Sequence, residues 1–256
     1  MSRIKTCFEK LKKENKTTLI TYLTAGDPNI EQTEKLIYAK AKAGADIIEI
    51  GIPFSDPPAD GPVIQRAAKR ALDNGVKVDD IFNMVKNIRK TLDIPLVFLV
   101  YYNIIFSYGK DKFIKNCEEV GIDGLIIPDL PLEERDEILP LPETLDLIPL
   151  VAPNSKDRIG KIVENTSGFV YCVSSMGVTG VRDNFEINIE NYLNEVRKYT
   201  DLPLAIGFGI SKRSDVEKFE KIADGVIVGS AIVKIIEETN GDIEKVSQKV
   251  KELKNL

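Results

Sequence analysis

Residues 19–51 read LITYLTAGDPNIEQTEKLIYAKAKAGADIIEIG, and their pattern decides the fold. Two short apolar runs, 19–24 and 46–51, enclose a stretch, 30–44, whose apolar residues recur at helical spacing and which closes on Gly44. Near-continuous apolar runs are typical of parallel strands covered on both faces, and glycine commonly ends a helix. The stretch therefore predicts a strand, a helix and a second, parallel strand.

This alternation continues along the whole chain. Six further apolar runs predict strands at residues 96–100, 124–127, 147–151, 169–173, 204–206 and 225–228. Eight strand–helix units in about 250 residues are typical of a closed (β/α)₈, or TIM, barrel. A doubly wound open sheet is the alternative, because the repeat alone does not show closure. The count of eight favours the barrel.

Two segments depart from the regular repeat. The long interval between the second and third strands holds two helical patterns, 63–73 and 78–90, which indicate an insertion after strand two. An extra N-terminal helix over residues 2–14 is expected to cover the barrel floor. No linker rich in glycine or serine divides the chain, so we expect residues 1–256 to form a single α/β domain.

Composition limits the partners and the location. The net charge is −5, and the 35 basic and 40 acidic residues are interspersed, which argues against a nucleic acid or an anionic membrane as partner. The longest apolar run, 96–102, is far shorter than the ~20 residues of a membrane helix. The N-terminus has no apolar signal core. We therefore expect a cytoplasmic protein.

Composition also limits the chemistry. The chain has no histidine, which excludes Ser-His-Asp hydrolysis and every His-ligated metal centre. Its three cysteines, Cys7, Cys117 and Cys172, are widely spaced and predict neither a disulfide framework nor a zinc site. We expect no metal, and any acid–base catalysis must use carboxylates, tyrosine, lysine or cysteine.

The second predicted strand carries a carboxylate, Glu49, inside the apolar run 47–51. Active sites of parallel barrels lie at the carboxyl ends of the strands. A carboxyl group in apolar surroundings has a raised pKa, which suits it to donate a proton near neutral pH. The alternative is a structural glutamate that is paired with arginine or lysine.

The loop that follows, IPFSDPPADGP at residues 52–62, holds two aspartates among four prolines. Proline fixes φ, so this acidic loop should be stiff and able to bring a second carboxylate over the pocket. We assign that catalytic role to Asp60 and interpret Asp56 as a turn or contact residue. The alternative is a surface loop in which an aspartate caps the helix that starts near Pro62.

Glycine-rich loops after strands seven and eight predict a phosphate site. GFGIS at 207–211 and Gly229-Ser230 lie where TIM barrels cradle phosphate with backbone N–H groups. The long loop 174–184 predicts a lid over the substrate, with a disordered surface loop as the alternative. No predicted strand contains lysine, which opposes a Schiff-base aldolase. A phosphorylated substrate and carboxylate catalysis remain.

The segment EIGIPFSDPPADGP at residues 49–62 closely resembles the signature of tryptophan synthase α subunits. Further matches follow in order along nearly the whole chain: TAGDP at 24–28, PDLPLEE at 128–134, GVTG at 177–180, GFGI at 207–210 and GSAIV at 229–233. The resemblance implies a carbon–carbon lyase of tryptophan biosynthesis. Its reaction is the reversible retro-aldol cleavage of indole-3-glycerol phosphate to indole and glyceraldehyde 3-phosphate.

The resemblance also implies residue roles. Glu49 would be the general acid–base that protonates indole C3, and Asp60 would hydrogen-bond the indole N–H. The other matching positions are the indole pocket (Tyr22, Val100, Tyr171 and Phe208), the lid residue Thr179, and the phosphate site (Gly180, Gly209, Gly229 and Ser230).

A partner is implied as well. The resemblance implies a β subunit that uses pyridoxal phosphate and receives indole through a tunnel in an α2β2 heterotetramer, with no cofactor on this chain. The inter-subunit surface would include Pro53, Asp56, Asp129 and Pro131. Pro58 and the pair Ser175-Met176 depart from the family pattern, which concerns the lid and inter-subunit signalling more than the reaction.

Three other functions stay open. A stand-alone lyase that releases free indole would share the active site and differ in turnover without a β subunit. A catalytically silent scaffolding subunit is opposed by the intact Glu49 and Asp60. A different phosphosugar lyase or isomerase on the same barrel is opposed only weakly, by the residues of the indole pocket.

Overall fold

The computed structural model describes residues 2–173, 189–207 and 209–256. Within these residues one parallel sheet has the strand order β5-β4-β3-β2-β1-β9-β8-β7-β6. Its strands are β1 (Thr18–Thr24), β2 (Ile47–Gly51), β3 (Leu96–Leu99), β4 (Gly124–Ile126), β5 (Asp146–Leu147), β6 (Leu150–Val151), β7 (Val170–Val173), β8 (Leu204–Gly207) and β9 (Gly225–Val228). These nine segments overlap the eight runs that the sequence predicts as strands, and β1, β5 and β8 each extend one residue beyond the predicted bounds.

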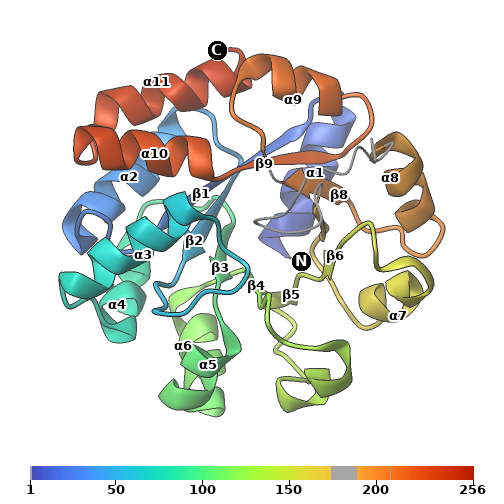
Figure 1. Ribbon diagram of the computed structural model, residues 1–256, viewed down its shortest axis with the longest axis horizontal. Coiled ribbons are helices and arrows are strands. Elements are labelled where there is room, and N and C mark those ends of the chain that lie inside the picture. Colours follow the sequence, from blue (N-terminus) through green and yellow to red (C-terminus); the bar gives the residue numbers. More distant parts are fainter. Residues whose placement is uncertain (1, 174–188, 208) are drawn as a thin grey trace.

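The fifth predicted strand is split into β5 and β6, and it closes the sheet into a barrel (Figure 1). The N–H of Ile148 donates to the carbonyl of Leu125 in β4, at 2.9 Å, and the N–H of Tyr171 in β7 donates to the carbonyl of Pro149, also at 2.9 Å. Pro149 has no N–H of its own, which interrupts the regular pairing at this point. The barrel prediction is confirmed, and the open doubly wound sheet is excluded.

Side chains on β2 alternate between the inside and the outside of the barrel. Ile47 belongs to the interior apolar cluster, whereas Ile48 and Ile50 pack in the larger cluster between sheet and helices. Because successive residues of a strand face opposite sides, Glu49 shares the interior face with Ile47 and Gly51. The strand register therefore places the one carboxylate of β2 inside the barrel.

Helices surround the sheet, as Figure 1 shows. The insertion after β2 forms α3 (Pro62–Asp73) and α4 (Val78–Ile88), which confirms the two predicted helical patterns. The segment after β4 forms only a 3₁₀ helix, η1 (Leu132–Glu137). The remaining elements are α2 (Ile30–Lys42), α5 (Tyr102–Tyr108), α6 (Lys110–Val120), η2 (Lys156–Arg158), α7 (Ile159–Val163), α8 (Ile189–Arg197), α9 (Arg213–Phe219), α10 (Ser230–Thr239) and α11 (Ile243–Lys254). Among the helices in the described ranges, none is both long and apolar enough to cross a membrane.

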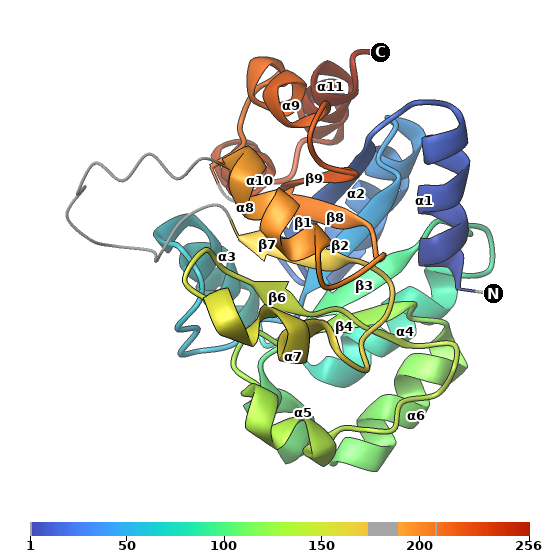
Figure 2. The ribbon, with the colours of Figure 1, turned by 90° about the vertical axis from the view of Figure 1, so that its right-hand side faces the viewer.

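The N-terminal helix α1 (Arg3–Lys13) closes one end of the barrel. Its residues Ile4 and Phe8 are buried in the interior cluster, where the ring centroids of Phe8 and Phe169 lie 5.7 Å apart. Figure 2 shows α1 at the end of the barrel opposite to α3. The predicted floor helix is therefore confirmed. The opposite end of the barrel is the one at which the strands end and the loops that follow them lie, together with α3.

Candidate active site

Glu49 lies inside the barrel with its side chain almost fully buried. The residue is 1 % exposed and pairs in register with Tyr22 of β1 and Val97 of β3. Its Oε2 atom has no hydrogen-bond partner among the described residues. Burial, assisted by the negative charge of Asp60, raises the pKa of Glu49 to about 8, while Lys40 opposes the shift. A buried carboxyl group of this kind carries a proton at pH 7 and can donate it.

Asp60 lies in the loop between β2 and α3, and this loop is attached to the end of β3. The Tyr101 hydroxyl accepts a hydrogen bond from the Ala59 N–H at 3.2 Å, and the Tyr101 ring stacks on Phe54 with 5.2 Å between centroids. Burial raises the pKa of Asp60 to about 6, and a hydrogen bond from Tyr101 opposes the increase. The loop is thus held where its second aspartate faces the barrel end.

Capping of α3 does not explain Asp60. The N-cap of α3 is Gly61, and no side chain caps this helix. The alternative in which an aspartate serves as the helix cap is therefore excluded for Asp60. At pH 7 the two carboxyl groups are in different states, because the pKa of Glu49 lies above neutrality and that of Asp60 below it. One can act as a proton donor while the other acts as an anion.

Two buried tyrosines lie beside the carboxyl groups, and each fits only because a glycine faces it. A Cβ at Gly51 would lie 2.0 Å from the Tyr22 Oη, and one at Gly207 would lie 2.6 Å from the Tyr171 Oη. Burial raises the pKa of both tyrosines, and the nearby charges of Glu49 and Asp60 add to the increase. Both hydroxyls are therefore neutral donors that border the same space as the two carboxyl groups.

On the apolar side of this space, β3 contributes a different residue from the one that the sequence predicts. Leu99 packs against the small cluster that contains Tyr22, with Ile64 and Val233. Val100, the predicted pocket residue, packs instead in the outer cluster between sheet and helices. The structure thus does not bring Val100 to Tyr22, because alternation along the strand directs Leu99 inward.

The loops after β8 and β9 are neighbours, because Gly207 pairs in register with Ile227. Gly209 has φ +74°, a conformation that favours glycine, and a Cβ there would meet no atom within 4 Å. Gly229 is the N-cap of α10, whose first residue is Ser230, and neither a side-chain cap nor an acidic residue occupies that first turn. Free N–H groups at a helix start are suited to an anion.

Three predicted site residues, Thr179, Gly180 and Phe208, lie outside the described residues, as does the predicted lid at 174–184. Of the predicted partner residues, Asp56, Asp129 and Pro131 are exposed, and Asp129 accepts a hydrogen bond from the Tyr102 N–H at 2.8 Å. Pro53 is buried within this chain. The structure therefore places three of the four predicted interface residues at the surface.

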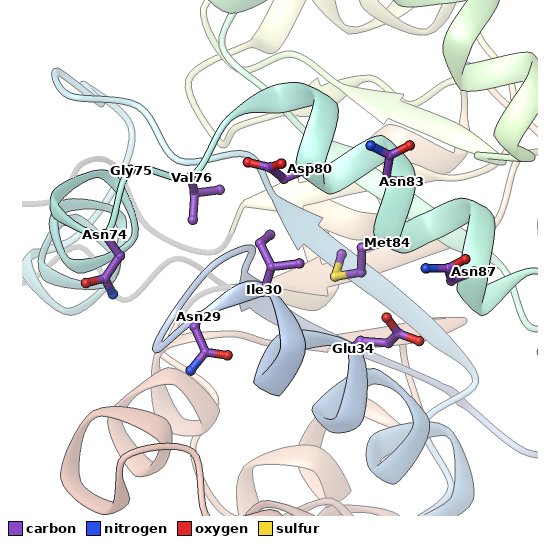
Figure 3. Close-up of a pocket in the computed structure, with 10 residues that line it drawn as sticks. All are labelled: Asn29, Ile30, Glu34, Asn74, Gly75, Val76, Asp80, Asn83, Met84 and Asn87. Atoms are coloured by element: carbon purple, nitrogen blue, oxygen red, sulfur yellow. The ribbon is translucent and has the colours of Figure 1, made fainter.

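A separate hollow of about 420 Å³ lies on the outside of the barrel (Figure 3). It is bordered by α2, α4 and the turn 74–76 between α3 and α4, and it contains none of the predicted site residues. Within residues 2–173, 189–207 and 209–256, no group of three or more aspartate, glutamate or cysteine side chains is arranged to hold a metal ion. The hollow is therefore separate from the site that the sequence predicts inside the barrel.

Sequence reasoning missed two residues of the site. Tyr101, which hydrogen-bonds Asp60, directly follows the third predicted strand, and that position is a signal for the active end of a barrel. Lys40 acts on Glu49 from α2, and its signal is a lysine that falls at the helical spacing of the buried residues Leu36 and Ile37. Both signals are visible only once the buried carboxylate has been chosen as the centre.

Comparison with known proteins assigns the chain to a family. The family described as "Tryptophan synthase alpha chain" matches residues 8–256. The tryptophan synthase alpha chain of Alkaliphilus metalliredigens is 52 % identical over 264 residues, which cover 100 % of this chain and 99 % of the relative. That of Thermoanaerobacter pseudethanolicus is 57 % identical over 238 residues, 92 % of this chain and 91 % of the relative.

Solved structures agree. Tryptophan synthase subunit alpha from Legionella pneumophila superimposes with a TM-score of 0.91 at 35 % identity, covering 100 % of this chain and 98 % of that one. A chain of tryptophan synthase from M. tuberculosis, in an open form, superimposes with a TM-score of 0.89 at 34 % identity, with the same coverage. The resemblance carried by residues 49–62 is confirmed, and the chain belongs to the tryptophan synthase alpha chain family.

Proposed function

We propose that this chain is the α subunit of a tryptophan synthase and cleaves indole-3-glycerol phosphate reversibly to indole and glyceraldehyde 3-phosphate. The observation that carries the proposal is the pair of carboxyl groups at the barrel end. Glu49 is buried with a pKa raised to about 8, and Asp60 beside it has a pKa raised only to about 6. The proposal assigns one proton donor and one anion to a single pocket.

The two carboxyl groups supply the chemistry of a retro-aldol cleavage. Glu49 gives its proton to C3 of the indole ring, which becomes tetrahedral, and the ring nitrogen takes up the positive charge. The Asp60 carboxylate accepts a hydrogen bond from the indole N–H and stabilises that charge. The hydroxyl group on the adjacent side-chain carbon then loses its proton to the Glu49 carboxylate and becomes the aldehyde. The electrons of the broken C–C bond return to the ring, and indole leaves.

The other site residues position the substrate. We assign the walls of the indole pocket to Tyr22, Tyr171 and Leu99, and the phosphate to the N–H groups around Gly209, Gly229 and Ser230. The glycine opposite each tyrosine and the uncapped first turn of α10 support these roles. Val100 is not assigned to the pocket, because it packs in the outer cluster. Phe208, Thr179 and Gly180 stay predictions from the family resemblance.

An alpha chain of tryptophan synthase implies a β subunit as partner. We propose an α2β2 complex in the cytoplasm, with residues 1–256 acting as one domain. In it the exposed Asp56, Asp129 and Pro131 face the β subunit, and Pro53 is buried beneath that surface. Pyridoxal phosphate would be bound by the β subunit, which would use the indole to make tryptophan, and this chain would need no cofactor.

Indole release from indole-3-glycerol phosphate tests the proposal. The purified chain is assayed alone, with a β subunit, and as the Glu49→Gln variant under both conditions. We expect slow release alone, a large increase with the β subunit, and no release by the variant, which should still bind the phosphate group. Fast release by the chain alone would indicate the stand-alone lyase. The absence of indole under both conditions would contradict the proposed reaction.

A further inference from the structure

Lys40 is a fully buried lysine that the reaction described above does not use. It lies on α2, which contacts β1 and β2 on the outside of the barrel (Figure 1), and it is 0 % exposed. Its Nζ donates to the carbonyl oxygens of Thr21, at 3.1 Å, and of Tyr22, at 3.0 Å. No carboxylate of the described residues forms an ion pair with it. A buried ammonium group without a paired anion is costly, so its retention calls for a physical reason.

Lys40 is connected to Glu49 through the pairing of β1 with β2. Tyr22, whose carbonyl accepts from Lys40, is the register partner of Glu49 in the β1–β2 ladder. Lys40 approaches the sheet from the helix side, and Glu49 projects from the adjacent strand into the barrel. Both groups are removed from water, and charges at such sites interact far more strongly than they do in solvent.

The charges that face Glu49 come from several elements. Asp60 faces it from the loop after β2, and Tyr101 is hydrogen-bonded to Asp60. Tyr22 faces it from β1, Tyr171 from β7, and Lys40 from α2. The tyrosines are neutral and Asp60 is negative, and Lys40 is the one basic side chain among these groups. Burial and Asp60 raise the pKa of Glu49, and Lys40 lowers it.

This balance matters to a group that must both give and take a proton. Without an opposing positive charge, a carboxyl group that is buried beside an anion would keep its proton at every pH near neutrality and would donate it poorly. Burial lowers the pKa of Lys40 in turn, and Glu49 raises it, so each group favours the charged form of the other.

We propose that Lys40 is a positioning residue that holds a buried positive charge against Glu49 across the sheet and so sets the pH range in which Glu49 exchanges its proton. The inference rests on the proposed function for its effect on catalysis, but the interaction itself belongs to the folded chain. Lys40 touches no substrate, because it lies on the helix side of β1.

Two variants remove the charge. Lys40→Met keeps the length of the apolar stem, and Lys40→Gln keeps an N–H donor. Lys42→Met is the matched control, because Lys42 lies on the same helix and is exposed. The Glu49 carboxyl is titrated by ¹³C NMR in protein labelled at glutamate Cδ, and its signal is assigned by its loss in Glu49→Gln. We expect the midpoint to move to higher pH by about one unit or more in both Lys40 variants and to stay unchanged in the control.

The interaction is also measured from the other side, in protein with Lys40 intact. The titration of Lys40, followed through labelled lysine side chains, should move to lower pH in Glu49→Gln than in the wild type, because the coupling between two groups is reciprocal. This measurement stands even if the Lys40 variants do not fold. In active protein, the alkaline limb of the rate profile of indole release should move with the Glu49 midpoint.

An unchanged Glu49 midpoint in a folded Lys40 variant, or an unchanged Lys40 midpoint in Glu49→Gln, would overturn the inference. A reduced rate without a shifted pH limb would indicate a merely structural role and would overturn it too. Both titrations need no substrate. A wild-type chain that releases no indole would therefore contradict the proposed function without deciding the role of Lys40.

Discussion

Replacing Gly51 by alanine should destabilise the chain through Tyr22. The added Cβ would lie 2.0 Å from Oη, 2.6 Å from Cζ and 2.7 Å from Cε2 of that tyrosine. Tyr22 is 6 % exposed and is packed against Ile64, Ala67 and Val233, so any displacement of its ring disturbs that packing. Overpacking costs about 1–3 kcal/mol, and loss of a buried hydrogen bond costs about 1 kcal/mol more.

The hydrogen bond at risk joins the Tyr22 hydroxyl and Thr24 Oγ1 at 3.1 Å. We therefore expect Gly51→Ala to lower the free energy of unfolding by about 2–4 kcal/mol. Urea unfolding followed by circular dichroism measures this in the wild type, Gly51→Ala, Tyr22→Ala and the double variant. Without the ring, the same substitution should cost less than about 1 kcal/mol. An equal loss in both backgrounds, or no loss with Tyr22 present, would refute the reasoning.

Further predictions concern charges and thiols away from the reacting groups. Asp27 is buried and accepts two hydrogen bonds from Arg70, at 2.8 and 2.7 Å, so Asp27→Asn should cost about 3 kcal/mol in urea unfolding. Asp73→Asn, which breaks an exposed pair with Lys69, should change stability by no more than about 0.5 kcal/mol; equal losses would contradict this account. Hydrogen bonds from Arg66, and then the charges of Arg70 and Arg66, lower the pKa of Glu237 to about 2. The stability that Glu237 gives the folded chain is therefore present above the ordinary pKa of 4.5 and is lost as pH falls toward 2. Glu237→Gln should remove that part of the acid dependence of thermal unfolding, and an unchanged dependence would count against the pairing. Burial raises the pKa of the Cys7 and Cys172 thiols to about 12 and that of Cys117 well above its usual value, so a thiol reagent at pH 8 should label the native chain slowly and all three cysteines quickly in urea. Rapid labelling of native protein would show that these thiols are more accessible than the structure implies.

The barrel could be predicted from sequence because each strand appears as a short apolar run. Each apolar run is bounded by turn residues, and the repeat of eight leaves few topologies. The break at Pro149 was not predicted, although proline cannot donate to a strand ladder, because a run with one proline still reads as a continuous strand. The sequence repeat likewise predicts a helix after the fourth strand, where the structure has only the 3₁₀ segment η1.

The candidate site was predictable where a residue breaks its local pattern. Glu49 is a carboxylate within an apolar run, and Asp60 lies in a loop stiffened by proline. Which residue of β3 faces the pocket was not predictable to one position, because a shift of one residue reverses the face, and Leu99 rather than Val100 packs with Tyr22. Lys40 was missed because its effect on Glu49 depends on the packing of α2 against β1, which no spacing along the chain shows.

The pH dependence of indole release tests the central claim, that Glu49 donates the proton, most directly. The rate is measured from pH 5 to 9 on the wild-type chain with its β subunit, beside Glu49→Gln. Asp60 must be ionised and Glu49 protonated, so the rate should rise as pH passes about 6 and fall as it passes about 8. The variant should release no indole at any pH. A rate that keeps rising from pH 7 to 9, or wild-type rates in Glu49→Gln, would contradict the account.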